Sequence, residues 1–295
     1  MIILWYFLKM IRINKITGGR FGNRVLQYNS LVQLSDLLGV EASCCSWEGN
    51  FFFESIVDDV PPTKHQSFLN WNTVLHGDIT QLPMDSDYNI DDPASLLHNT
   101  FKKLTKKDPR DFLQIREEFK PVLDKSKVNV GIHIRGDDII SADGNNGREI
   151  HSPDYYKKAI DLVNSEFNDV IYHVCTDDVT FETYTKTLDY LKEKKYTFVV
   201  GNLSDHFKDF ALLSECDVLI CSSSTFVITA GFLGKANKKI IHSLDWIKKH
   251  FDDSYVPWGN YTQDYPESYW KSYDNFWLDL YNDKGSKYYK AWKFI

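Results

Sequence analysis

Two kinds of sequence pattern alternate between residues 128 and 242, and this alternation constrains the fold more than any other feature. Short apolar runs predict strands at 128–134, 170–175, 196–200, 218–221 and 239–242, and the stretches between them predict helices at 153–163, 180–194, 205–214 and 225–233. Strands that alternate with helices form a parallel sheet that the helices cover. This half of the chain therefore predicts a doubly wound α/β domain.

The first half has one clear strand–turn–helix unit. A β-rich segment at 10–17 runs into Gly18-Gly19, and a helical pattern follows from Val25 to Leu38. Gly39 then provides the residue type that most often ends a helix. Residues 40–100 are interrupted by prolines and predict loops and short elements, with further helices at 94–105 and 109–119.

The length of 295 residues is typical of two domains. A polar stretch after Pro121 suggests where they meet. We predict an N-terminal domain at 1–125, the doubly wound domain at 126–250, and a helical tail at 251–295 that packs back on the first domain.

Charge and cysteine content exclude several classes of protein. Lys and Arg number 34 against 41 Asp and Glu, a net charge of −7. A nucleic-acid-binding protein needs a basic face, so we predict no nucleic-acid partner, although a few local cations are enough to hold an anionic nucleotide. The five cysteines form no C-x-x-C pair, which predicts free thiols and a cytoplasmic location.

Residues 1–13 are the most apolar stretch of the chain, but Lys9 and Arg12 interrupt them. The stretch is shorter than the ~20 residues that span a bilayer, and its charges follow the apolar run, unlike those of a signal peptide. We predict a short lead followed by a buried strand and no transmembrane span. The alternative is a weak peripheral membrane anchor.

The turn Gly18–Arg24 lies between the first predicted strand and its helix. Glycines there let the backbone approach a ligand closely, and a helix N-terminus favours an anion. The turn lacks the G-x-G-x-x-G spacing of a dinucleotide site. A tight strand-to-helix turn with no ligand is the alternative interpretation.

A second motif, Gly131–Asp138, covers the end of the predicted strand at 128–134 and the four residues after it. Alternation along the strand places His133 and Arg135 on one face at its carboxyl end, where open α/β sheets bind ligands. A guanidinium can bond two oxygens of a diphosphate at once and stabilise the charge that grows as the diphosphate leaves. An Arg–Asp pair at the strand end is the alternative.

Two further strand ends carry polar residues. Cys221–Phe226 presents four hydroxyls at a helix N-terminus, which is a suitable cradle for phosphate, or in part simple N-capping. Asp177 and Asp178 follow the strand at 170–175. Their carboxylates could accept hydrogen bonds from a guanine edge or a ribose, or could cap the next helix.

These residues together resemble the GDP-fucose-dependent fucosyltransferase superfamily, which includes the α-1,2-, α-1,6- and protein O-fucosyltransferases. The turn Gly19–Asn23 is similar to the G-x-F/L-G-N-Q motif, and His133-x-Arg135-x-x-Asp138 matches H-x-R-x-x-D. Asp209–Leu233 resembles the D-x-x-x-M-S and S-S-F segment of the α-1,2 family, and Thr176-Asp177-Asp178 resembles its S/T-D-D. The motifs occur in the family's order over residues 18–233.

The resemblance implies a GT-B-like fold of two Rossmann-type domains that face across a cleft, with the acceptor side in the first. It implies transfer of fucose from GDP-fucose to a glycan hydroxyl, with inversion and without a metal or other cofactor. Arg135 would hold the β-phosphate, and His133 would orient the nucleotide. The implied donor-binding residues are Gly19, Phe21, Gly22, Asn23, Arg24, Asp138, Asp177, Asp178, Ser222, Ser223, Ser224, Thr225 and Phe226.

Several departures from the family pattern leave the acceptor and the linkage open. Arg24 replaces the usual Gln, Gly136 the second Arg of H-x-R-R, Ser223 an Asn, and Ile228-Thr229 a Trp pair. The sequence does not select a general base among Glu48, Glu54 and Asp58. A transferase for another nucleotide sugar and a catalytically inactive glycan-binding relative are the alternative functions.

Overall fold

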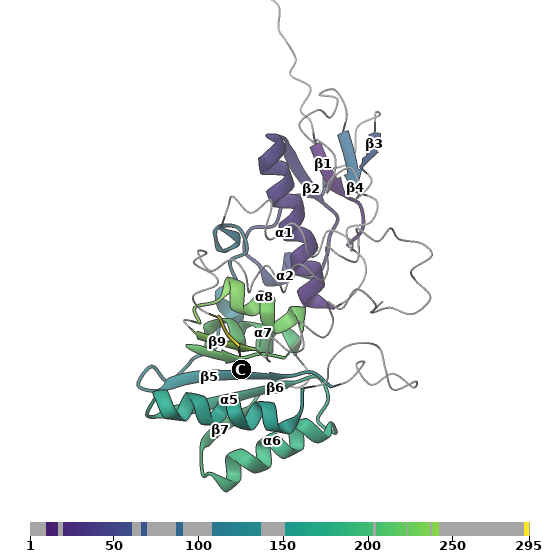
Figure 1. The fold of residues 1–295 in the computed structure, drawn as a ribbon. Helices are drawn as coiled ribbons and strands as arrows, with labels where there is room; N and C mark the ends of the chain where they lie inside the picture. The colour runs from purple at the N-terminus through teal and green to yellow at the C-terminus, as the bar shows by residue number, and fades with distance from the viewer. Residues whose placement is uncertain are drawn as a thin grey trace, which may run out of the picture. The chain divides into compact units, whose positions relative to one another are not determined.

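The computed structural model describes residues 10–16, 20–60, 66–69, 87–90, 108–136, 151–202, 205–222, 224–236, 238–241 and 292–294. The chain forms two compact units, residues 1–114 and 115–295, which are coloured from purple to yellow along the chain in Figure 1. The predicted helix at 94–105 and most of the predicted tail at 251–295 lie outside the described residues.

The first unit contains a four-stranded parallel sheet in the order β2-β1-β4-β3. Its strands are β1 (Met10–Ile13), β2 (Glu41–Cys44), β3 (Gln66–Leu69) and β4 (Asp87–Ile90). Its helices are α1 (Phe21–Leu38), the short α2 (Gly49–Phe52) and the 3-10 turn η3 (Pro109–Asp111). α1 packs against β1 and β2, so the predicted strand–turn–helix unit is confirmed.

The segment 40–100 contains three strands that the sequence pattern did not reveal. Each of them is only four residues long, and a run that short is at the lower limit for recognising a strand from its pattern. In β4 all four residues are buried although Asp87 and Asn89 are polar, so their burial could not be expected from residue type. The prediction of one helix at 109–119 was wrong, since the chain there forms two single turns, η3 and η4 (Glu117–Phe119), separated by an extended stretch.

α1 ends as the sequence predicts. Gly39 adopts the left-handed conformation with φ of 64°, and its N–H donates to the carbonyls of Ser35 and Asp36. Glycine reaches this conformation without the steric cost that a Cβ brings.

The second unit contains a six-stranded parallel sheet in the order β10-β9-β8-β5-β6-β7. Its strands are β5 (Val128–Ile134), β6 (Val170–Thr176), β7 (Thr197–Val200), β8 (Val218–Ile220), β9 (Lys238–Ile241) and β10 (Trp292–Phe294). Its helices are α5 (Pro153–Glu166), α6 (Glu182–Glu193), α7 (His206–Glu215) and α8 (Thr225–Leu233). Figure 1 shows α5 and α6 on one face of the sheet and α7 and α8 on the other, as in the predicted doubly wound domain.

The unit begins at Ile115, ahead of the boundary predicted after residue 125, because η4 belongs to its core. The ring of Phe119 lies 5.9 Å from that of Phe207 at the start of α7. At the other end of the chain, β10 pairs with β9 in this same sheet.

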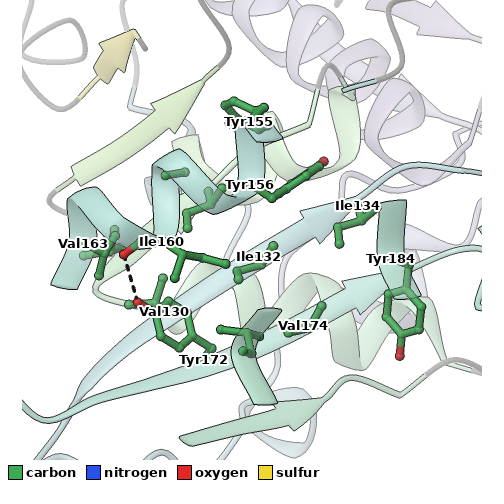
Figure 2. Close-up of a cluster of buried hydrophobic side chains, with 14 of the residues drawn as sticks. Val130, Ile132, Ile134, Tyr155, Tyr156, Ile160, Val163, Tyr172, Val174 and Tyr184 are labelled. Atoms are coloured by element: carbon green, nitrogen blue, oxygen red, sulfur yellow. Dashed lines mark hydrogen bonds between the residues drawn. The ribbon is translucent and has the colours of Figure 1, made fainter. Parts of the chain in front are cut away.

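The core of the second unit lies between β5, β6 and α5. Val130, Ile132 and Ile134 lie on one face of β5 and pack against α5 and the neighbouring strand (Figure 2). Gly131 lies on the opposite face, where a Cβ would come within 2.8 Å of Leu213 in α7. The alternation therefore lets α7 approach β5 closely and turns His133 to the same side as Gly131.

Replacing Gly39 with alanine should lower the free energy of unfolding of the first unit by about 1 kcal/mol. The cost is conformational, because no atom lies within 4 Å of a Cβ placed there. Urea unfolding followed by circular dichroism measures the change. Gly39→Asn is the matched control and should lose less, since asparagine tolerates the left-handed conformation; equal losses for both variants would contradict this account.

Candidate functional site

The order of the second sheet has a reversal point between β5 and β8. Chain connections run outward from this pair in opposite directions, β6 and β7 on one side and β9 and β10 on the other. In such sheets a ligand binds beyond the carboxyl ends of the two central strands, where the flanking loops diverge. His133 lies in β5 and Arg135 directly after it. Ser222 and Ser224 follow the end of β8. The topology therefore brings two of the predicted motifs to this end of the sheet.

His133 and Ser222 join the two strand ends directly. The Nδ1 atom of His133 lies 2.6 Å from the Oγ of Ser222, and both side chains are buried. The imidazole also lies 5.3 Å from the ring of Phe226 in α8, which in turn contacts Phe210 edge to face. The imidazole of His133 is therefore held by the hydroxyl of Ser222 and the ring of Phe226 where β5 and β8 end.

Arg135 is held at the ends of β5 and β6. Its Nη1 lies 2.6 Å from Oδ2 of Asp177, and the side chains of the pair are only 10% and 18% exposed. The other oxygen of Asp177 accepts the N–H of Gly136 at 2.8 Å. One carboxylate thus orients the guanidinium and the backbone beside it, as the Arg–Asp alternative anticipates. A guanidinium so positioned suits an anion with two adjacent oxygens.

α8 begins directly after β8, so its positive N-terminal end follows the second strand of the reversal point. Ser224 is the N-cap, and its Oγ accepts the N–H of Phe226 at 3.3 Å. The N–H of Ser224 itself donates to the carbonyl of Ser222 at 2.8 Å. Capping therefore accounts for one hydroxyl of the serine run and the bond to His133 for another, while Thr225 begins the helix at its positive end.

Asp178 has a local structural partner. Its Oδ1 accepts both the N–H and the hydroxyl of Thr180, at 2.8 and 2.7 Å, ahead of α6. This is an Asx turn and not a helix cap, because α6 has Phe181 as its N-cap residue and no side chain caps it. Of the predicted site residues, Gly19, Asp138 and Ser223 lie outside the described residues.

The predicted site residues Phe21, Gly22, Asn23 and Arg24 form the first turn of α1 in the first unit. Phe21 is buried in an aromatic cluster with Trp47, Phe52 and Phe53. Arg24 is ion-paired with Glu48 at 3.0 Å. Phe21 therefore has a core role in this unit.

Two tyrosines support the site, and the sequence pattern did not mark them. The hydroxyl of Tyr155 donates to the carbonyl of Cys221 at 2.7 Å, and that of Tyr156 to the carbonyl of His133 at 3.1 Å. Figure 2 shows both near the start of α5. Burial raises the pKa of both hydroxyls well above its ordinary value, so they remain neutral donors. They fix the backbone on both sides of the reversal point.

Asp209 supports the loop after β7. It is 6% exposed, and its Oδ1 accepts the N–H of Asn202 at 2.7 Å. Burial raises the pKa of its carboxyl from 3.8 to about 6, and the hydrogen bonds from Asn202 and Cys175 offset part of that rise.

The described part of the chain contains no group of three or more His, Cys, Asp or Glu side chains placed to hold a metal ion. None of its helices is long and apolar enough to cross a membrane. The five cysteines, all among the described residues, form no disulfide.

Comparison with known proteins places this arrangement in a family. Residues 110–262, just over half of the chain, match the model of glycosyl transferase family 11. No curated protein sequence matches the chain significantly.

Solved structures share its fold. POFUT1 in complex with GDP-fucose is 13% identical with a TM-score of 0.52, and the match covers 77% of this chain and 95% of that one. A FUT1 variant from Arabidopsis thaliana in complex with GDP is 13% identical with a TM-score of 0.51, over 81% and 71% of the two chains. At 13% identity, the similarity of this chain to the two structures concerns the fold alone. It confirms the predicted GT-B-like α/β fold class.

The raised pKa of Asp209 predicts a pH-dependent stability. The folded state binds the proton of the Asp209 carboxyl more tightly than the unfolded state does. The contribution of this carboxyl to the free energy of unfolding is therefore fully present below pH 3.8 and is lost as the pH rises to about 6. Asp209→Asn keeps the acceptor for Asn202 but does not titrate. Relative to wild type, its free energy of unfolding should rise by on the order of 3 kcal/mol between pH 4 and pH 6.5. Urea unfolding across this range checks it, and a constant difference would be evidence against the assignment.

Proposed function

The chain belongs to glycosyl transferase family 11, and from this membership we propose that it transfers fucose from GDP-fucose to a hydroxyl group of a glycan acceptor. The observation that carries the proposal is the guanidinium of Arg135, which Asp177 holds at the end of β5, the strand that pairs with β8 ahead of α8 at the reversal point of the sheet. This is the place and the chemistry for a nucleotide diphosphate. The complexes of POFUT1 with GDP-fucose and of FUT1 with GDP support guanosine as the nucleotide.

The proposed reaction is a single displacement with inversion at the anomeric carbon. The oxygen of the acceptor hydroxyl bonds to the anomeric carbon and gives up its proton to a general base. The bond from that carbon to the β-phosphate oxygen breaks, and GDP leaves with the electron pair. Negative charge grows on the diphosphate, and donors already in position around it lower the barrier. Arg135 is the principal counter-charge, so we propose that no metal ion is required.

The remaining residues hold the donor in place. The positive end of α8, which begins at Thr225, attracts the phosphates, and the ring of Phe226 lies 5.3 Å from that of His133. His133 keeps its orientation through Ser222 and Tyr156.

Calorimetric titration with GDP, ADP and UDP in EDTA tests the donor. We expect GDP alone to bind tightly, since guanosine is the nucleotide in the complexes of the similar structures. A preference for ADP or UDP would favour a transferase for another nucleotide sugar. No binding of any of the three would favour a glycan-binding relative without turnover.

Arg135→Ala should lower kcat by about 10²- to 10³-fold, the loss found when one donor to a developing oxyanion is removed. Arg135→Lys keeps the charge but not the planar fork and should lose less. Arg110→Ala is the matched control, because Arg110 forms an exposed pair with Asp108. Release of GDP from GDP-fucose measures the rate, and near-normal turnover of a folded Arg135→Ala variant would refute the site.

A further inference from the structure

Ser222 is placed to decide which ring nitrogen of His133 carries a proton. A neutral imidazole has an N–H donor on one nitrogen and an acceptor lone pair on the other, and the hydrogen bond of one nitrogen fixes the state of both. Nδ1 of His133 lies 2.6 Å from Oγ of Ser222, and the two residues are only 4% and 2% exposed. The state of the imidazole therefore follows from the direction of this hydrogen bond.

The surroundings of His133 favour the neutral ring over the cation. Burial disfavours the charged form of an imidazole, and a neighbouring positive charge disfavours it further. The guanidinium of Arg135 belongs to the residue two positions after His133. The positive end of α8 begins at Thr225, next to Phe226, whose ring lies 5.3 Å from the imidazole. A neutral ring with one donor and one acceptor nitrogen is therefore the form expected at neutral pH.

The distance between the two side chains indicates that the serine is the donor. Hydroxyl O–H···O bonds measure about 2.5–3.0 Å, whereas N–H···O bonds measure about 2.7–3.2 Å. The 2.6 Å between Oγ of Ser222 and Nδ1 of His133 lies in the first range and below the second. A buried hydroxyl that left its proton unbonded would also cost free energy, and donation to Nδ1 avoids that cost. Nδ1 is then the acceptor, and Nε2 carries the proton.

The ring of His133 is held from other sides as well, so its Nε2 N–H has a fixed direction. The hydroxyl of Tyr156 donates to the carbonyl of His133 at 3.1 Å and fixes the backbone at the end of β5. Phe226 lies against the ring, and Phe210 contacts Phe226 edge to face. A donor held in this way attracts an acceptor oxygen, such as those of phosphate and ribose. The other neutral form would present a lone pair to the same oxygen and repel it.

We propose that Ser222 is a positioning residue, whose hydroxyl keeps His133 in the neutral form with the proton on Nε2, and that this N–H donates to an oxygen of the nucleotide. The inference rests on the function proposed above and deepens it. Ser222 acts through His133 and has no need to contact the nucleotide itself. The state of the ring then determines whether its contact with the nucleotide is attractive.

Nuclear magnetic resonance of the whole chain, labelled with isotopic histidine, tests the assignment directly. The nitrogen shifts distinguish a protonated ring nitrogen from one with a lone pair. The signals that are missing from a His133→Asn spectrum identify His133 among the nine histidines. Above the ordinary imidazole pKa of about 6.5, we expect the proton of His133 on Nε2. A proton on Nδ1 of the folded wild type would overturn the inference, with or without nucleotide.

Ser222→Ala removes the hydroxyl and should let the two neutral forms of His133 exchange, so that its nitrogen shifts become averages. The Kd for GDP should rise by about 3- to 10-fold, the equivalent of one hydrogen bond. Ser222→Thr keeps a hydroxyl and should keep the wild-type nitrogen shifts. Thr187→Val is the matched control, because it removes a buried hydroxyl from α6 that donates to the carbonyl of Thr183; its Kd should equal that of wild type.

Titration with guanosine beside GDP identifies the oxygen that accepts. Weaker binding of both ligands to Ser222→Ala places the contact on the ribose, and weaker binding of GDP alone places it on the diphosphate. Unchanged nitrogen shifts, or unchanged affinity for both ligands, in folded Ser222→Ala would overturn the inference. If wild type binds no nucleotide, the proposed function fails and the contact with the nucleotide fails with it. The nitrogen shifts still decide whether Ser222 sets the state of His133.

Discussion

The hydrogen bond between His133 and Ser222 joins the two strands at which the second sheet reverses its order. A parallel sheet with this order directs its loops apart at one edge and leaves a place for a ligand between them. The bond lies at the ends of β5 and β8 and holds the imidazole next to the ring of Phe226. The position of Arg135 and the start of α8 both follow from the same pair of strands.

Polar groups buried beneath the site are satisfied by side chains from another element. Tyr155 and Tyr156 extend from α5 to the backbone carbonyls of Cys221 and His133. In a low-dielectric interior an unpaired carbonyl is costly, and a satisfied network is correspondingly rigid. Rigid placement matters for a transferase because donors aimed in advance at a leaving group require no reorganisation during the reaction.

The site of the second unit carries a fixed positive charge. The ion pair of Arg135 and Asp177 lies at the ends of β5 and β6, and α8 begins after β8, the other neighbour of β5. A guanidinium and the positive end of a helix on neighbouring strands both favour an anionic ligand.

Short-range pattern determined much of this protein from its sequence alone. The strands and helices of the second unit follow from local sequence pattern. α8 spans the predicted residues 225–233 because its cap, Ser224, and its uninterrupted apolar run are both properties of neighbouring residues. The end of α1 at Gly39 was predicted for the same reason. Strands β3 and β4 were not predicted, because each is only four residues long and stands in a segment interrupted by prolines, where so short a run does not establish a strand.

Contacts between distant residues were decided by the tertiary structure. His133 and Ser222 are 89 positions apart, and only the strand order makes them neighbours. The sequence gives Tyr155 no sign of a role beyond its helix, because its hydrogen-bond partner, the carbonyl of Cys221, lies 66 positions away. The sequence thus determined which residue types stand at each strand end, and the packing of strands and helices decided which of them meet, because register and strand order depend on the whole chain.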